Sequence, residues 1–250
     1  MRQRGFMSDF KWMLIPLLTL SLNAVAQEPQ STCLRGFHTL YSDKATGLDI
    51  ASQRPVVVAA PDGQKSLSIR VVGNTRDSED RYLNIAAGIG KKTFKIKLAG
   101  FNGEVAWSPD SKAFAVTLTV VGGGLGSNVY AFFVDKGGVT KLNVFAPVVK
   151  DFGTPVQCDV PLAPNTAFVR WGADSSSIFL AAEVVPAGIC NCMGTYRVYE
   201  VGLPDLRILQ TFSQTDAKKK FQGDLGCELR DADDKCVEAV ERYARTKKGY

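Results

Sequence analysis

The residues with the clearest capacity for chemistry are six cysteines: Cys33, Cys158, Cys190, Cys192, Cys227 and Cys236. One residue separates Cys190 from Cys192, and such a pair suggests either a redox centre or half of a metal site. Redox motifs usually place two residues between the thiols, and a structural zinc site needs two further ligands at a recognisable spacing. We therefore interpret Cys190 and Cys192 as members of two separate disulfides that leave a tight hairpin.

The even number of cysteines favours up to three disulfides in an oxidising compartment. The sequence leaves the pairing open, because six cysteines allow fifteen combinations. Cys227 and Cys236 flank the start of an expected C-terminal helix, so a bond between them is one candidate pairing.

Hydrolytic chemistry has little support. The chain has one histidine, His38, and no G-x-S-x-G motif accompanies it. The glycine-rich runs Gly122–Gly126 and Gly88–Thr93 are similar to phosphate loops, but a strand pattern follows each where a helix N-terminus is required. We predict neither a catalytic site nor a cofactor from these motifs.

A calcium site is suggested by Asp231, Asp233 and Asp234, which lie just before the expected helix. The segment lacks the turn glycine and distal glutamate of an EF-hand. We interpret these aspartates as helix-capping residues and predict no metal site.

The first 26 residues have the three parts of a secretory signal peptide. Basic residues begin it, an apolar run over Trp12–Leu22 follows, and Ala24-Val25-Ala26 provides a small-residue exit. The apolar run contains Pro16 and is shorter than the roughly 20 residues of a membrane span. We expect cleavage after Ala26, a periplasmic or secreted protein, and no membrane span after cleavage. Translation from Met7 would retain this leader.

The charge balance argues against a nucleic-acid partner. The chain has 30 basic and 25 acidic residues, and removal of the leader, with three basic residues and one acidic residue, leaves 27 and 24, a net charge of +3. Nucleic-acid-binding domains usually carry a larger or clustered excess. Lysines alternate with apolar residues over Lys91–Leu98, which is typical of a half-buried strand with a solvated face. Lys218–Lys220 is typical of a solvated connector.

Short segments rich in β-branched and aromatic residues, separated by polar turns, predict an all-β domain. The expected strands are Val56–Ala60, Ser66–Val72, Tyr82–Ala87, Thr93–Leu98, Val105–Trp107, Ala113–Val121, Val129–Val134, Lys141–Phe145, Ala167–Trp171, Ile178–Val185, Thr195–Val201 and Ile208–Phe212. An apolar stripe of Val237, Val240 and Ala244 predicts one C-terminal helix that ends near Lys247.

Three stretches share one plan: APDGQKSLSI at 60–69, WSPDSKAFAV at 107–116 and WGADSSSIFL at 171–180. Asp62, Asp110 and Asp174 occupy equivalent turn positions, at intervals of 48 and 64 residues. We interpret them as turn residues that accept backbone N–H groups. Trp107 and Trp171 are then packing residues between neighbouring sheets.

This plan resembles the WD40-like repeats of TolB-type β-propellers, whose blades carry W-S-P-D-G-K before an apolar strand. The second copy matches at Trp107, Ser108, Pro109, Asp110 and Lys112. The third copy retains Trp171 and Asp174, and the first retains Pro61, Asp62 and Gly63 but has Ala59 in place of tryptophan.

The chain also departs from that family. Ser111 and Ser175 stand where the family has glycine, so we expect either a different turn or a small cost for positive φ. Propellers usually need four or more blades to close, and only three copies are evident. The resemblance therefore implies a partial or small propeller, with residues 33–58 as a candidate for part of a fourth blade.

The predicted organisation is a signal peptide over 1–26, an N-terminal segment over 27–52, a repeat domain over 53–213 and a linker with a helix over 214–250. The predicted fold is an all-β, propeller-like array of antiparallel four-stranded blades with one C-terminal α-helix.

The resemblance and the compartment favour an exported, non-catalytic binding module that binds a protein or cell-envelope component. The alternative is an envelope hydrolase acting on glycan or peptide, through His38 or a loop carboxylate. Loops 121–128, 153–166 and 186–194 are the longest and richest in glycine and proline, so we expect loop-borne binding there. An open array would need a partner or an oligomer to cover its edges.

Overall fold

The computed structural model describes residues 41–48, 55–72, 82–100, 102–120, 126–153, 163–185 and 192–247. Several predictions lie outside these residues: the signal peptide with its cleavage site, His38, Cys33, Cys158, Cys190 and most of the three long loops.

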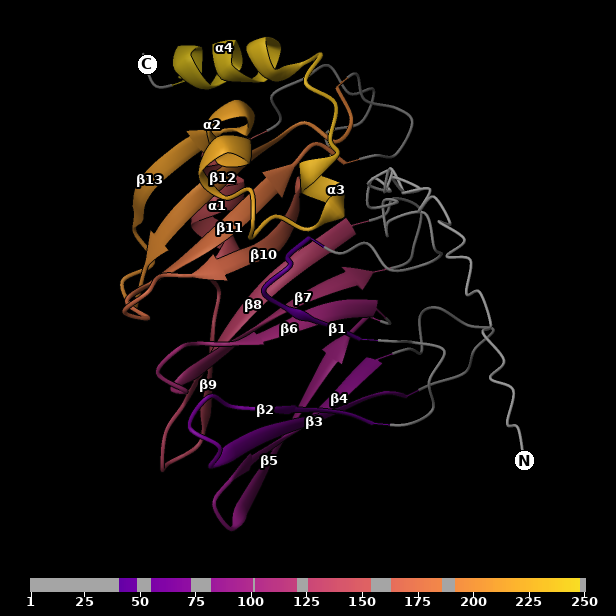
Figure 1. The fold of residues 1–250 in the computed structure, drawn as a ribbon, viewed down its shortest axis with the longest axis vertical. Coiled ribbons are helices and arrows are strands. Elements are labelled where there is room, and N and C mark those ends of the chain that lie inside the picture. The colour runs from indigo at the N-terminus through magenta and orange to yellow at the C-terminus, as the bar shows by residue number, and fades with distance from the viewer. Residues whose placement is uncertain are drawn as a thin grey trace, which may run out of the picture. The chain divides into compact units, whose positions relative to one another are not determined.

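The described chain forms three antiparallel sheets, which are seen as successive layers in Figure 1. The first contains, in spatial order, β2 (Val56–Ala59), β3 (Lys65–Val72), β4 (Tyr82–Ile89) and β5 (Lys92–Ala99). The second contains β1 (Thr46–Leu48), β6 (Asn102–Trp107), β7 (Ala113–Val120), β8 (Gly126–Val134) and β9 (Val139–Leu142). The third contains β10 (Asn165–Trp171), β11 (Ser177–Glu183), β12 (Tyr196–Gly202) and β13 (Ile208–Ser213).

The predicted all-β, propeller-like array is confirmed, and each predicted strand overlaps an observed one. The predicted strand Lys141–Phe145 extends too far along the chain. β9 ends at Leu142, and Phe145 begins helix α1 (Phe145–Phe152) instead of ending a strand. Val148 and Phe152 are buried on the same face of this helix, so the apolar residues there follow helical spacing.

The sheets stack face to face through two apolar layers. Between the first and second sheets, the largest fully buried residues include Leu67, Leu83, Ile85, Phe114 and Leu118. The layer between the second and third sheets includes Phe168, Ile178, Leu180 and Tyr199, and α1 contributes to it. The strands β6 and β7 of the second sheet therefore alternate their side chains between two different layers, which is why both faces of these strands are buried.

The tryptophans of the second and third repeats each donate a hydrogen bond to the sheet that comes before them in the chain. Trp107 Nε1 on β6 donates to the Val58 carbonyl on β2 at 3.1 Å. Trp171 Nε1 on β10 donates to the Ala106 carbonyl on β6 at 3.3 Å. Val58 and Ala106 occupy equivalent places, one residue before Ala59 and Trp107, so the same contact joins both pairs of neighbouring sheets.

Ser111 and Ser175, at positions where the TolB-type repeats have glycine, each accept a hydrogen bond from the turn of the preceding repeat. Ser111 and Ser175 adopt φ of 58° and 61°, so the positive-φ turn is kept despite the side chain. Ser111 Oγ accepts the Asp62 N–H at 2.9 Å, and Ser175 Oγ accepts the Asp110 N–H at 3.2 Å. The hydroxyl thus offers a contact to the preceding turn that glycine lacks.

The first repeat lacks both contact residues. Ala59 stands at its tryptophan position, and Gly63, with φ of 67°, at its serine position. The tryptophan and the serine therefore occur only in the two repeats that stack on a preceding described sheet. The first repeat has no such sheet before it among the described residues, so it forms one end of the array.

The other end of the array is covered by helices. Helices α2 (Gln214–Lys220) and α3 (Cys227–Arg230) place Ala217, Phe221 and Leu229 on the outer face of the third sheet, against Phe179 and Phe212. Figure 1 shows both helices beside β12 and β10. The segment predicted as a linker therefore covers an apolar sheet face, and the described residues contain three helices beyond the one predicted.

The predicted C-terminal helix is confirmed as α4 (Val237–Lys247), with Val240 buried. Asp233 and Asp234 were expected to cap this helix, but their carboxylates accept other hydrogen bonds. The Asp233 carboxylate accepts the Lys235 N–H at 2.9 Å, and the Asp234 carboxylate accepts Gln214 Nε2 at 2.7 Å and Lys218 Nζ at 2.9 Å. The segment is thereby attached to α2, because Gln214 is fully buried there.

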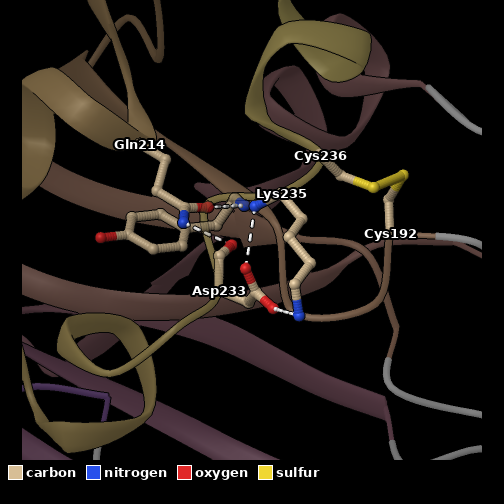
Figure 2. Close-up of a disulfide and its surroundings, with 6 residues drawn as sticks. Cys192, Gln214, Asp233, Lys235 and Cys236 are labelled. Carbon is tan, nitrogen blue, oxygen red and sulfur yellow. Dashed lines mark hydrogen bonds and ion pairs between the residues drawn. A yellow bond between two sulfur atoms is a disulfide. The ribbon is translucent and has the colours of Figure 1, made fainter.

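The candidate pairing of Cys227 with Cys236 is wrong. Cys236 is bonded to Cys192, with Cα atoms 5.2 Å apart, as Figure 2 shows. The Gln214 side chain holds residues 233–234 beside the start of β12, which brings Cys236 to the loop that precedes this strand. Cys227 is also disulfide-bonded. An intramolecular disulfide is typical of an oxidising compartment. In the described residues, no helix is both long and apolar enough to cross a bilayer.

The turn chemistry generates a testable prediction at Ser111. Ser111→Ala removes the acceptor of the Asp62 N–H and keeps the strained φ, so we expect the free energy of unfolding to fall by about 1 kcal/mol. Ser111→Gly also removes the acceptor but relieves a strain of about 1 kcal/mol, so it should be the more stable variant. Gly63→Ala, where strain is added without loss of a bond, is the control and should destabilise. Urea unfolding measures all three, and equal stability of the two Ser111 variants would contradict this account.

Candidate functional site

A pocket of about 480 Å³ lies at the Asp-containing turns that follow β2, β6 and β10. Its lining contains five apolar residues, Pro61, Trp107, Pro109, Phe168 and Trp171, and three charged residues, Lys44, Arg170 and Asp224, which are called its charged side below. All three repeats contribute to it, together with the segment before β1 and the turn after α2. The sequence-predicted residues Trp107, Pro109 and Trp171 therefore meet at one place, although sequence reasoning gave them structural roles.

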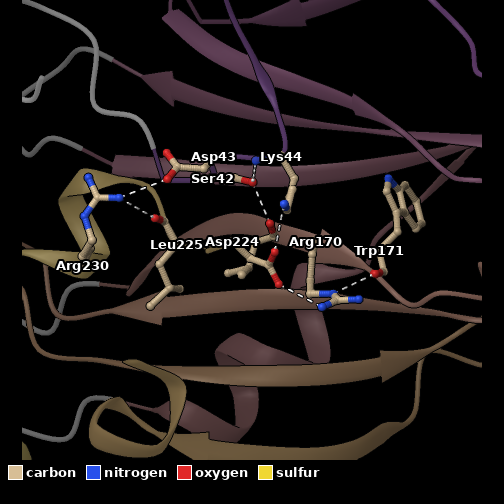
Figure 3. Close-up of polar contacts among 9 residues, drawn as sticks. Ser42, Asp43, Lys44, Arg170, Trp171, Asp224, Leu225 and Arg230 are labelled. Carbon is tan, nitrogen blue, oxygen red and sulfur yellow. Dashed lines mark hydrogen bonds and ion pairs between the residues drawn. The ribbon is translucent and has the colours of Figure 1, made fainter. Parts of the chain in front are cut away.

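Asp224 organises the charged side of this pocket (Figure 3). Its Oδ2 atom lies 2.8 Å from Arg170 Nη1, and its Oδ1 atom lies 3.3 Å from Lys44 Nζ. Arg170 Nε also donates to the Trp171 carbonyl at 3.1 Å, which directs the guanidinium across the end of β10. Two cations face one carboxylate, so the charged side carries an excess of one positive charge.

The residues of this charged side differ in accessibility. The Lys44 side chain is 54% exposed and that of Arg170 35%, whereas that of Asp224 is 13% exposed. Asp224 therefore mainly positions Lys44 and Arg170, and these two cations are the charged groups that a ligand can reach. Sequence reasoning missed all three residues, because their proximity depends on contacts between residues 44, 170 and 224.

The segment around Ser42 places Lys44 at the pocket. Ser42 Oγ donates to the Val169 carbonyl on β10 at 2.6 Å, and Asp43 N–H donates to the Asp224 carbonyl at 3.0 Å. The segment then continues into β1, which pairs with β6. The described part of residues 33–58, proposed as part of a fourth blade, thus contributes β1 to the second sheet and Val56–Val58 of β2 to the first.

The three repeat aspartates point to their own turns. Asp62, Asp110 and Asp174 each accept the N–H two residues further along the chain, at 2.9, 3.1 and 3.0 Å. The Ser176 N–H, followed by its hydroxyl, holds the pKa of Asp174 below its ordinary value. Asp62 has its pKa lowered chiefly by the Lys65 ammonium. These carboxylates serve the Asx turns that precede β3, β7 and β11.

Two glutamates outside the pocket lining are buried in the core. Glu104 on β6 accepts the Tyr41 N–H, and Glu183 at the end of β11 accepts Asn165 Nδ2 at 3.3 Å. Burial raises the pKa of each carboxyl to about 8, although hydrogen bonds from Tyr41 and Asn165 oppose the shift. Their exposures of 1% and 2% keep them from a substrate, so they attach the N-terminal segment and β10 to the core. The signal that could have found them is an acid inside an apolar strand, as in GEVAW and LAAEVV.

A second concavity of about 500 Å³ lies between α1, the turn before β13 and α4. Lys150, Asp151 and Arg207 line it with four apolar residues. Beside it, the buried Arg197 on β12 lies 3.0 Å from Glu241 on α4 and 3.9 Å from Asp151 on α1. These contacts fasten α4 to the third sheet, which is a structural role. In the described ranges, no group of three or more His, Cys, Asp or Glu side chains is arranged to hold a metal ion.

The chain matches no family model and no curated protein. Three chains among the solved structures match, including the acylaminoacyl peptidase of Pyrococcus horikoshii in its orthorhombic crystal form. That match has 11% identity and a TM-score of 0.38, and it covers 70% of this chain and 26% of the peptidase chain. This chain therefore spans about a quarter of that protein's length, and a likeness of this degree carries no conclusion about activity.

The buried Glu104 predicts a pH dependence of stability. Its pKa is about 8 in the folded state and close to 4.5 in the unfolded chain, so the folded state binds more protons between these values. Stability from this group is complete below pH 4.5 and is lost as the pH rises towards 8, at a limit of about 1.4 kcal/mol per pH unit. We expect Glu104→Gln to flatten this decline in urea unfolding at pH 5, 6.5 and 8. Glu238→Gln, on the exposed face of α4, is the control, and parallel profiles for Glu104→Gln and the wild type would disprove the assignment.

Proposed function

We propose that this protein is an exported, non-catalytic binding module of the cell envelope, built on a TolB-like repeat scaffold. The leader-like first 26 residues and the disulfides support export to a periplasmic or extracellular location. The repeat motif supports the TolB-like assignment. The single observation that carries the binding role is the pocket where Trp107, Trp171, Lys44 and Arg170 converge.

The chemistry of the pocket selects a class of ligand. The two tryptophans, with Pro61, Pro109 and Phe168, provide an apolar surface for an apolar body. Arg170 uses two of its N–H groups on Asp224 and Trp171, which leaves further donors for an incoming group within the described part of the chain. The net charge of +1 matches a single carboxylate. We therefore propose a ligand with an apolar body and one carboxylate, such as the C-terminal residues of a partner protein.

The pocket favours binding over hydrolysis. Its described lining contains neither serine nor cysteine, and its one carboxylate is held by two cations. Nucleophilic catalysis requires a nucleophile beside a base. No observation favours the alternative of an envelope hydrolase over a binding module.

A fluorescence titration tests this function. Trp107 and Trp171 are the two tryptophans outside the leader, so a ligand in the pocket should change the emission of both. The probes are short apolar peptides with a free C-terminal carboxylate and the same peptides as amides. We expect saturable binding of the acids and at least tenfold weaker binding of the amides, because a charge-assisted hydrogen bond contributes about 1.5–3 kcal/mol.

Variants locate the binding. Arg170→Gln and the milder Lys44→Gln should weaken binding of the acids, whereas Arg207→Gln at the second concavity should leave it unchanged. Circular dichroism confirms that each variant is folded. Equal affinity for acids and amides, or the absence of saturation across the panel, would contradict the proposed ligand class. Peptide cleavage detected by mass spectrometry in the same mixtures would contradict a non-catalytic role.

A further inference from the structure

The outer face of the first sheet has an unusual composition for an end of the array. Its side chains alternate with the buried ones on β2–β5, and the register places them in rows across the sheet. One row is Val57, Ser68, Ala86 and Lys95, and the next contains Arg70, Asn84 and Lys97. Val57 is 66% exposed, and Arg70, Lys95 and Lys97 are exposed as well. No described element packs on this face, in contrast to the helix-covered third sheet.

The described residues of the first sheet are predominantly basic. The described residues of β2–β5 and their turns include six basic residues, Lys65, Arg70, Lys91, Lys92, Lys95 and Lys97, and a single acid. That acid, Asp62, lies in a turn and is paired with Lys65. No carboxylate among these residues therefore compensates the charge of Arg70, Lys95 and Lys97, although the whole chain is nearly balanced.

Small side chains occupy the centre of this face, at Ser66, Ser68, Ala86 and Gly88, and the cations lie at neighbouring register positions. Lys95 and Lys97 are two residues apart on one strand, about 6.6 Å, so they project in the same direction. Neither of the two pockets described above includes a residue from the outer face.

We propose that the outer face of β2–β5 binds an anionic lipid surface. Positive charges in one plane are attracted to anionic headgroups, and each Lys or Arg near such a surface strengthens the attraction. Tyr82, with the Lys97 ammonium 3.9 Å from its ring centroid, adds an amphipathic side chain of the kind enriched at membrane interfaces. The exposed Val57 adds an apolar contact. This site is separate from the pocket and does not depend on the proposed function.

Other occupants fit less well. Protein–protein interfaces are depleted in lysine and enriched in large aromatics, whereas this face has two lysines and one aromatic ring. A polyanionic strand usually follows a groove with stacking aromatics. A second copy presenting the same face would repel it, and the opposite end of the array is covered by α2 and α3.

Vesicle co-sedimentation tests the proposal with the chain as recovered from expressing cells, its N-terminus read by mass spectrometry. The probes are POPC vesicles and POPC vesicles containing POPG. We expect binding only to the POPG vesicles, with strong weakening at high ionic strength. The triple variant Arg70→Gln/Lys95→Gln/Lys97→Gln should bind roughly 100-fold more weakly, because three surface charges are removed.

A charge-matched control separates local binding from net charge. Lys136→Gln/Lys219→Gln/Arg242→Gln removes three exposed charges elsewhere and should bind POPG vesicles at least tenfold more tightly than the first triple variant. Circular dichroism shows that both variants are folded. The proposal is overturned if both triple variants bind alike, if POPC alone binds as well, or if the wild type ignores POPG vesicles. Binding of heparin or polyglutamate that depends on Arg70, Lys95 and Lys97, without vesicle binding, would also overturn it in favour of a polymer or an acidic protein.

Discussion

The stacking of the sheets depends on one repeated interaction, in which an indole N–H reaches back to a backbone carbonyl of the preceding sheet. Trp107 and Trp171 make it at 3.1 and 3.3 Å, and each indole also contributes to the apolar layer that it spans. A large ring gives much buried area, while the N–H fixes where along the strand the sheets meet. The backward bonds of Ser111 and Ser175 repeat the same constraint at the turns.

A second constraint joins the second and third sheets. The segment at Tyr41 and Ser42 bonds to Glu104 on β6, to Val169 on β10 and to the turn at Leu225. It therefore joins the second sheet, the third sheet and the helical cover in a few residues. The neutral form of the buried Glu104 belongs to this junction, and the cations of the pocket are positioned by its continuation. Stability and the candidate binding site thus depend on the same short segment.

The two ends of the array have different chemistry. At the third sheet, Phe179 and Phe212 are covered by Ala217, Phe221 and Leu229, which an apolar face in water requires. At the first sheet, the outer face consists mainly of small side chains and cations, with Val57 and Tyr82 as its larger apolar contributors, so it can remain exposed. The first repeat lacks the backward-bonding tryptophan and serine as well. A polar end and a covered end let three sheets exist as a stack, in the way that capping repeats protect other repeat proteins.

Local sequence patterns were sufficient to predict the strands and the repeated turns of this protein. Alternation of apolar residues predicted the strands, and the recurring aspartate and tryptophan predicted the turns and the packing residues between sheets, because these features depend on neighbours in the chain. The short helices α2 and α3, the pairing of Cys192 with Cys236 and the meeting of Lys44, Arg170 and Asp224 were decided only by the tertiary structure. Each of these depends on residues far apart in sequence, whose approach follows from how sheets stack and which face remains to be covered. The spacing of residues along one strand or turn does not predict which distant residues come into contact.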